Sequence, residues 1–228
     1  MGYGNERAPL KAHLRKPLIG KAADIRYTRH DHVRAGTKLF HGDSPRHFVG
    51  ANDHRKLQAF ALVSSRPVIN AMSAAGHPCE VLSDGFYIHS RFGDIRDVRI
   101  GLWGPVTNVM TSWHELAKSL GLVIHHFCGA EFHCENTHVL FSDVVNTPVD
   151  VLLTDSWPAG YSDPQWTLTQ QHLSILGQPA LLPTPPFNIG EELGFDPVGY
   201  SGFCGYEQKT VLLKVQQAIV AYLLRHRK

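Results

Sequence analysis

The stretch that decides the fold is residues 98–127, VRIGLWGPVTNVMTSWHELAKSLGLVIHHF. It opens with the apolar, β-branched run VRIGLW (98–103), which is typical of a buried strand. The next segment places seven apolar side chains on one helical face before Gly121 ends it: Val106, Val109, Met110, Trp113, Leu116, Ala117 and Leu120. LVIHHF (122–127) indicates a second strand. Strand, helix and strand in this order predict a βαβ unit with two parallel strands.

The same alternation continues beyond this unit. VDVLLTDSW (149–157) and PALLPT (179–184) predict two further strands, with a helix between them over residues 166–176. An amphipathic helix follows over about residues 206–226, and its last turns are basic, as the dipole at a helix C-terminus favours. The pattern predicts an α/β fold with a parallel, Rossmann-like sheet flanked by helices.

Toward the amino terminus the pattern weakens. Residues 54–65 have helical spacing, RPVINA (66–71) indicates a short buried strand, and residues 77–91 indicate a helix stopped by Gly93. Residues 24–48 show no clear strand or helix. We expect a reduced amino-terminal region over residues 1–75 and an α/β domain over residues 76–228, with the last helix packing back on the former.

Composition narrows the function. The chain has 228 residues and a formal charge of +2, so it has no excess positive field for a nucleic acid. It has four cysteines without a CxxC pair, no apolar run of membrane-spanning length, and no signal-peptide pattern at its start. We therefore expect a reduced, cytoplasmic protein that binds neither nucleic acid nor membrane.

Ligands of open parallel sheets bind beyond the carboxyl ends of the strands, which selects residues 70–80, 104–108, 154–160 and 183–186. GLWGPVTNV (101–109) lacks the glycine pattern of a nucleotide site, and Asn108 there suits a helix cap as well as a ligand. In TDSWPAG (154–160), Asp155 could cap the next turn or hold an amino group, and position favours the second. Trp157 either covers the core or lines the site.

The stretch HHFCGAEFHCENTH (125–138) carries residue types that bind transition metals. Their spacing matches no common zinc pattern, and His125 and His126 point to opposite faces of a strand. A polar strand end with surface histidines is therefore favoured over a metal site.

Several motifs taken in order resemble the aspartate/ornithine carbamoyltransferase family. VINAMSAAGHPCEVLSD (68–84) is similar to the PVINxLxxxxHPCQxLxD segment of ornithine carbamoyltransferases. VRIGLWGPVTNV (98–109) is similar to their strand and Asn-Val turn, VDVLLTDSWPAG (149–160) to their D-V-W-x-S-M-G loop, and QPALLPTPP (178–186) to their H-C-L-P region. The resemblance covers roughly residues 52–228.

The resemblance implies carbamoyl transfer from carbamoyl phosphate to the amine of ornithine or a related amino acid, without a cofactor. It makes His77 and Glu80 the candidate catalytic residues, His77 holding the carbonyl of carbamoyl phosphate. Asn108 and Asp155 would hold the amino acid, and Trp157 and Leu182 would shape its pocket. Cys79 and Lys209 complete the candidate substrate-binding set. The resemblance also implies a homo-oligomer, a trimer, and makes residues 1–75 a divergent carbamoyl-phosphate-type region.

The sequence departs from the family pattern in five features. The phosphate-binding S-T-R-T-R is absent, a second arginine position falls on Gly50, the HPCQ glutamine is Glu80, and the H-C-L-P cysteine is Leu181. The closing E-N-R arginine has no match, although Lys209 lies close. Because a phosphate needs such cations, two alternatives stand beside an active enzyme: a non-catalytic amino-acid-binding relative, and a divergent transferase. An active enzyme would need replacement cations, from Arg46, Arg55, Lys56 or a neighbouring subunit.

Overall fold

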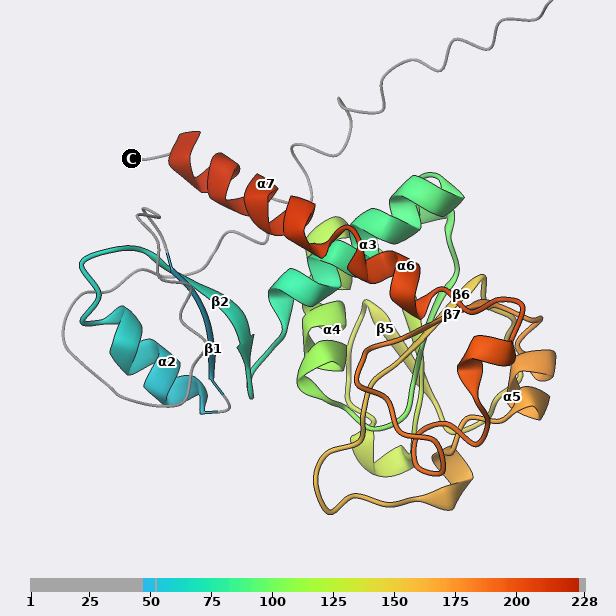
Figure 1. Cartoon of the computed structure of the whole chain (residues 1–228). Coiled ribbons are helices and arrows are strands. Elements are labelled where there is room, and N and C mark those ends of the chain that lie inside the picture. The colour runs from blue at the N-terminus through green and yellow to red at the C-terminus, as the bar shows by residue number, and fades with distance from the viewer. Residues whose placement is uncertain (1–46, 52, 226–228) are drawn as a thin grey trace, which may run out of the picture.

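The computed structural model describes residues 47–51 and 53–225, and most of them form one α/β layer structure (Figure 1). Its centre is a five-stranded sheet in the order β5-β4-β3-β6-β7, with every neighbouring pair parallel. The strands are β3 (Ile100–Trp103), β4 (Ile124–Phe127), β5 (Val139–Ser142), β6 (Val151–Thr154) and β7 (Ala180–Pro183). The predicted fold class is confirmed, as is the βαβ unit of residues 98–127.

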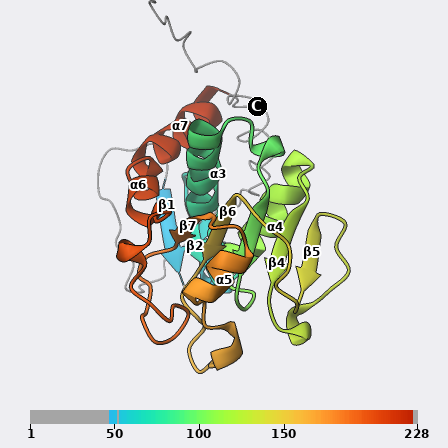
Figure 2. The ribbon, with the colours of Figure 1, turned by 90° about the vertical axis from the view of Figure 1, so that its right-hand side faces the viewer.

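The two faces of the sheet are covered differently, as Figure 2 shows. One face packs against α3 (Pro78–Phe92), α4 (Asn108–Leu120) and the later helix α7 (Leu212–Arg225). The other packs against α5 (Gln170–Ile175) and the loops around it. Each face of the sheet has its own hydrophobic core, and successive strand residues point to opposite faces. Leu102 therefore faces α3 and α4, while Trp103 faces α5. A strand buried on both faces explains the continuous apolar runs in the sequence.

Local signals fix the ends of the two central helices. Thr107 caps α4, its hydroxyl accepting from the backbone N–H of Met110, and Gly121 ends the helix in the left-handed conformation at φ 70°. In α3, Pro78 occupies the first turn, where no backbone donor is needed, and Gly93 ends the helix at φ 97°. The predicted helix over residues 77–91 is confirmed to within one residue at each end.

A second, two-stranded parallel sheet pairs β1 (His47–Ala51) with β2 (Val68–Ser73), joined by α2 (His54–Ala61). The helix and β2 were predicted. The expectation that residues 24–48 contain no strand was wrong for the last two residues of this range, because β1 begins at His47. Polar flanks hid this short strand in the sequence, and it forms through pairing with β2. Residues 1–46 lie outside the described part of the chain.

Three further elements differ from the predictions. β5 was missed, since it is a short edge strand with an exposed Leu140. Residues 166–176 form a helix only over α5. The last helix is broken at Thr210 into α6 (Gly205–Lys209) and α7, and α7 packs on α3. The 3-10 turns of the described chain are Ile95–Asp97, Ala130–Phe132, Pro164–Trp166 and Pro197–Gly199.

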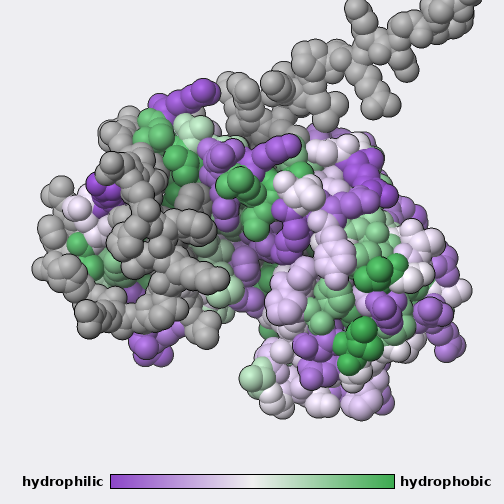
Figure 3. Space-filling view, viewed as in Figure 1, coloured by the Kyte–Doolittle hydropathy of each residue, from purple (hydrophilic) through white to green (hydrophobic). Residues whose placement is uncertain are grey.

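The surface in Figure 3 mixes hydrophilic and small hydrophobic areas over the part that carries the larger sheet. Within the described residues, no helix combines the length and apolar character that crossing a membrane requires.

Candidate functional site

The carboxyl ends of the central strands meet at one edge of the larger sheet. Trp103 pairs with Phe127 on one side and with Thr154 on the other, and Thr154 pairs with Pro183. The loops that follow β3, β6 and β7 therefore start side by side. The β2–α3 turn joins them, because the Asn108 amide Nδ2 donates to the Ser73 carbonyl at 2.8 Å.

Asn108 is the first residue of α4, and Thr107 is the cap. The capping role considered for Asn108 is thus filled by its neighbour. The side chain of Asn108 instead ties the α4 amino terminus to the end of β2. This bond brings the residues around His77 next to those around Asp155.

His77 stands at the amino-terminal boundary of α3 without capping it. Its backbone N–H donates to the Ser112 hydroxyl at 2.8 Å, which anchors the residue against α4. The side-chain Nδ1 is buried and has no hydrogen-bond partner among the described residues. Burial lowers the pKa of His77, and Lys209 adds to the shift while Glu80 opposes it. A neutral imidazole with one open nitrogen suits hydrogen bonding to a ligand.

Cys79 is buried, and its Sγ lies 3.5 Å from the Asn70 carbonyl. Burial, with the Glu80 charge second, raises the pKa of this thiol to about 12. The thiol therefore stays protonated near neutral pH and packs as a small apolar group.

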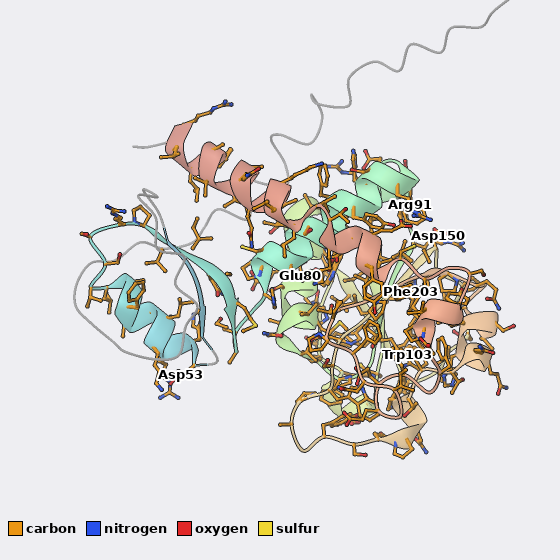
Figure 4. The ribbon with its side chains drawn as sticks, viewed as in Figure 1. Asp53, Glu80, Arg91, Trp103, Asp150 and Phe203 are labelled. Atoms are coloured by element: carbon orange, nitrogen blue, oxygen red, sulfur yellow. The ribbon has the colours of Figure 1, made fainter. Side chains whose placement is uncertain are left out.

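Glu80, in the first turn of α3, is 2% exposed, and its side chain contacts α6 (Figure 4). Its carboxylate forms an ion pair with Lys209 and accepts from the Gln208 amide at 2.8 Å. The same Gln208 amide donates to Asp84, one helical turn further along α3. Burial and the Glu80 charge raise the pKa of Asp84 well above its usual range, and Lys209 and the Gln208 hydrogen bond oppose this shift.

The two exposed cations expected to replace lost arginines lie elsewhere. Arg55 and Lys56 are in the first turn of α2, which Asp53 caps, and Figure 4 shows Asp53 well apart from Glu80. Arg46 lies outside the described residues. Lys209 is the cation that the structure brings beside His77, and it is already paired.

Asp155 follows β6 directly and is mostly buried. Burial raises its pKa to about 6, and the Glu192 and Glu80 charges add to this. Hydrogen bonds from the Thr107 side chain and the Ser156 backbone act in the opposite direction. Because Thr107 comes from the loop after β3 and Asp155 from the loop after β6, the bond between them joins the two loops.

Aromatic rings lie beside Asp155. Trp157 meets Tyr161 edge to face at 5.3 Å, and Tyr161 meets Phe132 at 5.7 Å. Trp157 also covers Gly104, where an added Cβ would lie 3.4 Å from the indole nitrogen. The indole nitrogen and the Tyr161 hydroxyl are buried without a hydrogen-bond partner in the described chain. Leu182, at 2% exposed, packs in the core on the α3 side of the sheet.

Within the histidine-rich stretch, His133 is exposed as predicted but His126 is not. His126 is fully buried, with Nδ1 3.0 Å from His114 and Nε2 2.9 Å from the Gly104 carbonyl. Phe141 stacks on it, at a ring distance of 5.4 Å. Across residues 47–51 and 53–225, no cluster of three or more His, Cys, Asp or Glu side chains is arranged to hold a metal ion.

Comparison with known proteins gives this geometry a context. No protein-family model matches the chain. The ornithine carbamoyltransferase of Methylobacillus flagellatus is 27% identical over 191 residues, which cover 74% of this chain and 62% of that protein. The ornithine carbamoyltransferase of Paracidovorax citrulli is 24% identical over 194 residues, which cover 75% of this chain and 63% of that protein. The ornithine carbamoyltransferase structure from Thermus thermophilus matches with a TM-score of 0.71 at 20% identity, over 79% of this chain and 67% of that one.

The chain is a relative of the aspartate/ornithine carbamoyltransferases. It spans less than two thirds of the length of the two curated relatives described above. In this carbamoyltransferase relative, the residue at the HPCQ glutamine position, Glu80, meets the residue near the closing arginine position, Lys209. Leu181, at the H-C-L-P cysteine position, is fully buried in the core on the α5 side.

Three residues that hold the site together were not predicted from the carbamoyltransferase motifs. Gln208 bridges two acids of α3, Asp84 is one of these acids, and Thr107 supports Asp155. The sequence contains one indication of Gln208, because this residue is adjacent to the predicted site residue Lys209. Thr107 carried one too, as a threonine before a helical run is a typical cap.

Proposed function

We propose that this site is the amine-substrate half of a carbamoyltransferase and that it binds ornithine or a related amino acid. The observation that carries the proposal is the meeting of Asn108, Asp155 and Trp157 at the carboxyl ends of adjacent parallel strands, in the motif order of the family. Asp155 is ionised above about pH 6 and can then pair with an ammonium group. Trp157 offers an apolar wall for the methylene chain of the ligand.

The reaction proposed for this half-site is transfer of a carbamoyl group from carbamoyl phosphate to the bound amine. As the amine attacks, negative charge builds on the carbonyl oxygen, and a donor placed there lowers the barrier. The open nitrogen of His77 is the proposed donor. The leaving phosphate needs cations, which we propose come from Arg46 or a neighbouring subunit of a trimer. A cytoplasmic location and the absence of a cofactor are part of the same proposal.

A second candidate is a non-catalytic relative that binds the amino acid alone, and the Glu80–Lys209 ion pair favours it. Lys209 would be available to a phosphate only by leaving Glu80, which would then remain as a buried unpaired charge. A divergent transferase with another donor is the remaining form of this alternative.

Calorimetric titration of the full chain separates these functions. Ornithine is titrated first, then carbamoyl phosphate, alone and with ornithine present, and product formation is assayed in parallel. Binding of ornithine that Asp155→Asn weakens at least about tenfold supports the amine site. Asp143→Asn, at an exposed acid, serves as the control. Turnover supports the transferase, whereas ornithine binding without carbamoyl phosphate binding supports the non-catalytic relative. Absence of ornithine binding would overturn the proposed amine site.

A further inference from the structure

The His77 end of the site holds a closed set of charges. Glu80 and Lys209 neutralise each other, and the Gln208 amide donates to both Glu80 and Asp84. The Glu80 field reaches both His77 and Asp155, so this carboxylate acts on both ends of the site. A phosphate dianion at this place would meet Lys209 already paired with the Glu80 carboxylate, so this cation would offer it little attraction. Such a ligand binds weakly unless the ion pair opens.

The open hydrogen-bonding atoms near His77 have a different complement. The Asn70 side-chain nitrogen faces the Ser73 hydroxyl at 3.1 Å and the Gly76 carbonyl at 3.5 Å. A carbonyl only accepts, so this contact places Nδ2 there and leaves Oδ1 as the free acceptor. Oδ1 and the His77 Nδ1 are buried and without partners among the described residues.

A neutral carbamoyl group carries the donors and the acceptor that complement these two atoms. Its N–H groups can donate to the Asn70 oxygen, and its carbonyl can accept from His77 in the tautomer with a proton on Nδ1. Neither interaction needs a free cation. Two buried, unpaired polar atoms are costly, so a ligand that satisfies both gains affinity.

From the Glu80–Lys209 ion pair we infer that Glu80 determines which carbamoyl compound this site accepts. By holding Lys209, Glu80 selects a neutral ureido amino acid, in which the carbamoyl group is already attached to the amine, over a carbamoyl group carried on phosphate. This inference rests on the proposed amine site alone, and it favours the second candidate function over turnover of carbamoyl phosphate.

The test is titration of the full chain with ornithine, N5-carbamoyl-ornithine, carbamoyl phosphate and inorganic phosphate at one ionic strength. The unsubstituted protein is expected to bind N5-carbamoyl-ornithine at least about tenfold more tightly than either phosphate compound. Glu80→Gln keeps the shape of the side chain and frees Lys209. It is expected to raise the affinity for carbamoyl phosphate and for inorganic phosphate at least about tenfold.

Two further variants make the result specific. Glu115→Gln makes the same change at an exposed glutamate of α4 outside this cluster, so phosphate affinity should stay unchanged. Adding Lys209→Met to Glu80→Gln should abolish the gained phosphate affinity. Melting curves of each variant establish that it folds.

Tight carbamoyl phosphate binding by the unsubstituted protein, or an unchanged affinity in Glu80→Gln, would overturn the role of Glu80. Weaker binding of N5-carbamoyl-ornithine than of carbamoyl phosphate would do the same. These failures leave ornithine binding intact, whereas loss of ornithine and N5-carbamoyl-ornithine binding together would mean that the proposed amine site itself is wrong.

Discussion

His114 donates from Nε2 to Nδ1 of His126 at 3.0 Å, and His126 donates from Nε2 to the Gly104 carbonyl at 2.9 Å. The direction follows from the carbonyl, which can only accept, so His126 carries its proton on Nε2 and His114 supplies the proton between the rings. The two imidazoles therefore form a directed chain from α4 to the loop after β3. This chain holds the loop that leads to Thr107 and Asn108.

We predict that this pair makes stability depend on pH. Burial lowers the pKa of His126 to about 3 and that of His114 to about 4, while both return toward about 6.5 in the unfolded chain. At a pH between the folded and the unfolded pKa values, the unfolded chain binds more protons than the folded chain. The free energy of unfolding is therefore greatest above about pH 6.5 and falls as the pH drops toward about 4. Urea unfolding from about pH 7 to about pH 5 should show this loss.

His114→Gln keeps a donor toward His126 but removes one titrating group. The pH dependence of unfolding should therefore become shallower than in the unsubstituted protein. His89→Gln, on α3, is the matched loss of a histidine and should leave the slope close to the original. If the free energy of unfolding depends on pH equally in the unsubstituted protein and in His114→Gln, the histidine pair is not the source of this dependence.

Ornithine binding should strengthen as the pH rises through about 6. The reason is that Asp155, whose pKa burial raises to about 6, is neutral below this pH and a carboxylate above it. Titrations at several pH values measure the effect. In Asp155→Asn this dependence should disappear together with most of the affinity, and a surviving step near the same pH would assign it to another group.

Thr107→Ala should have two separable effects. Loss of the α4 cap should lower stability by about 0.5–2 kcal/mol. Loss of the hydrogen bond to Asp155, which lowers the pKa of that residue, should move the midpoint of ornithine binding to higher pH. Thr169→Ala removes the corresponding cap of α5 and should lower stability without moving the midpoint. A midpoint that stays in place in Thr107→Ala would rule out the bond as a pKa determinant.

Gly104→Ala should lower both stability and ornithine affinity. Gly104 has φ 98°, which residues with side chains rarely adopt, and the new Cβ would lie in contact with Trp157 at 3.4 Å. The expected loss of stability is about 1–3 kcal/mol. Gly199→Ala, where nothing lies within 4 Å of the added atom, is the comparison and should change stability much less. Similar melting temperatures for the two variants would refute the strain at Gly104.

The sequence predicted the central sheet well because its strands are buried on both faces and its helices have clear ends. Trp103 and Leu152 lie in unbroken apolar runs, and Gly121 stops a regular helical face. β1 and β5 were missed because each is short and carries polar or exposed residues. Their formation depends on a neighbouring strand, which local patterns do not report.

The candidate site likewise has a part that the sequence predicted and a part that it did not. The positions of Asn108 and Asp155 follow from the rule that ligands bind beyond the carboxyl ends of parallel strands. The partner of Glu80 could not be predicted, since Lys209 is distant in sequence and the pairing arises only when α6 packs on α3. The burial of His126 was hidden similarly, because it requires Phe141 on the missed strand β5.

The strand order has a consequence for synthesis of the protein. β3 pairs with β4 on one edge and with β6 on the other, but β4 and β5 leave the ribosome before β6 does. Until Thr154 has been made, one edge of the most apolar strand region lacks its partner. Open strand edges readily recruit other chains, so this interval is when the nascent protein is most exposed to aggregation. A chaperone that shields Leu102 and Trp103 during that interval would be expected to raise the yield of folded chains.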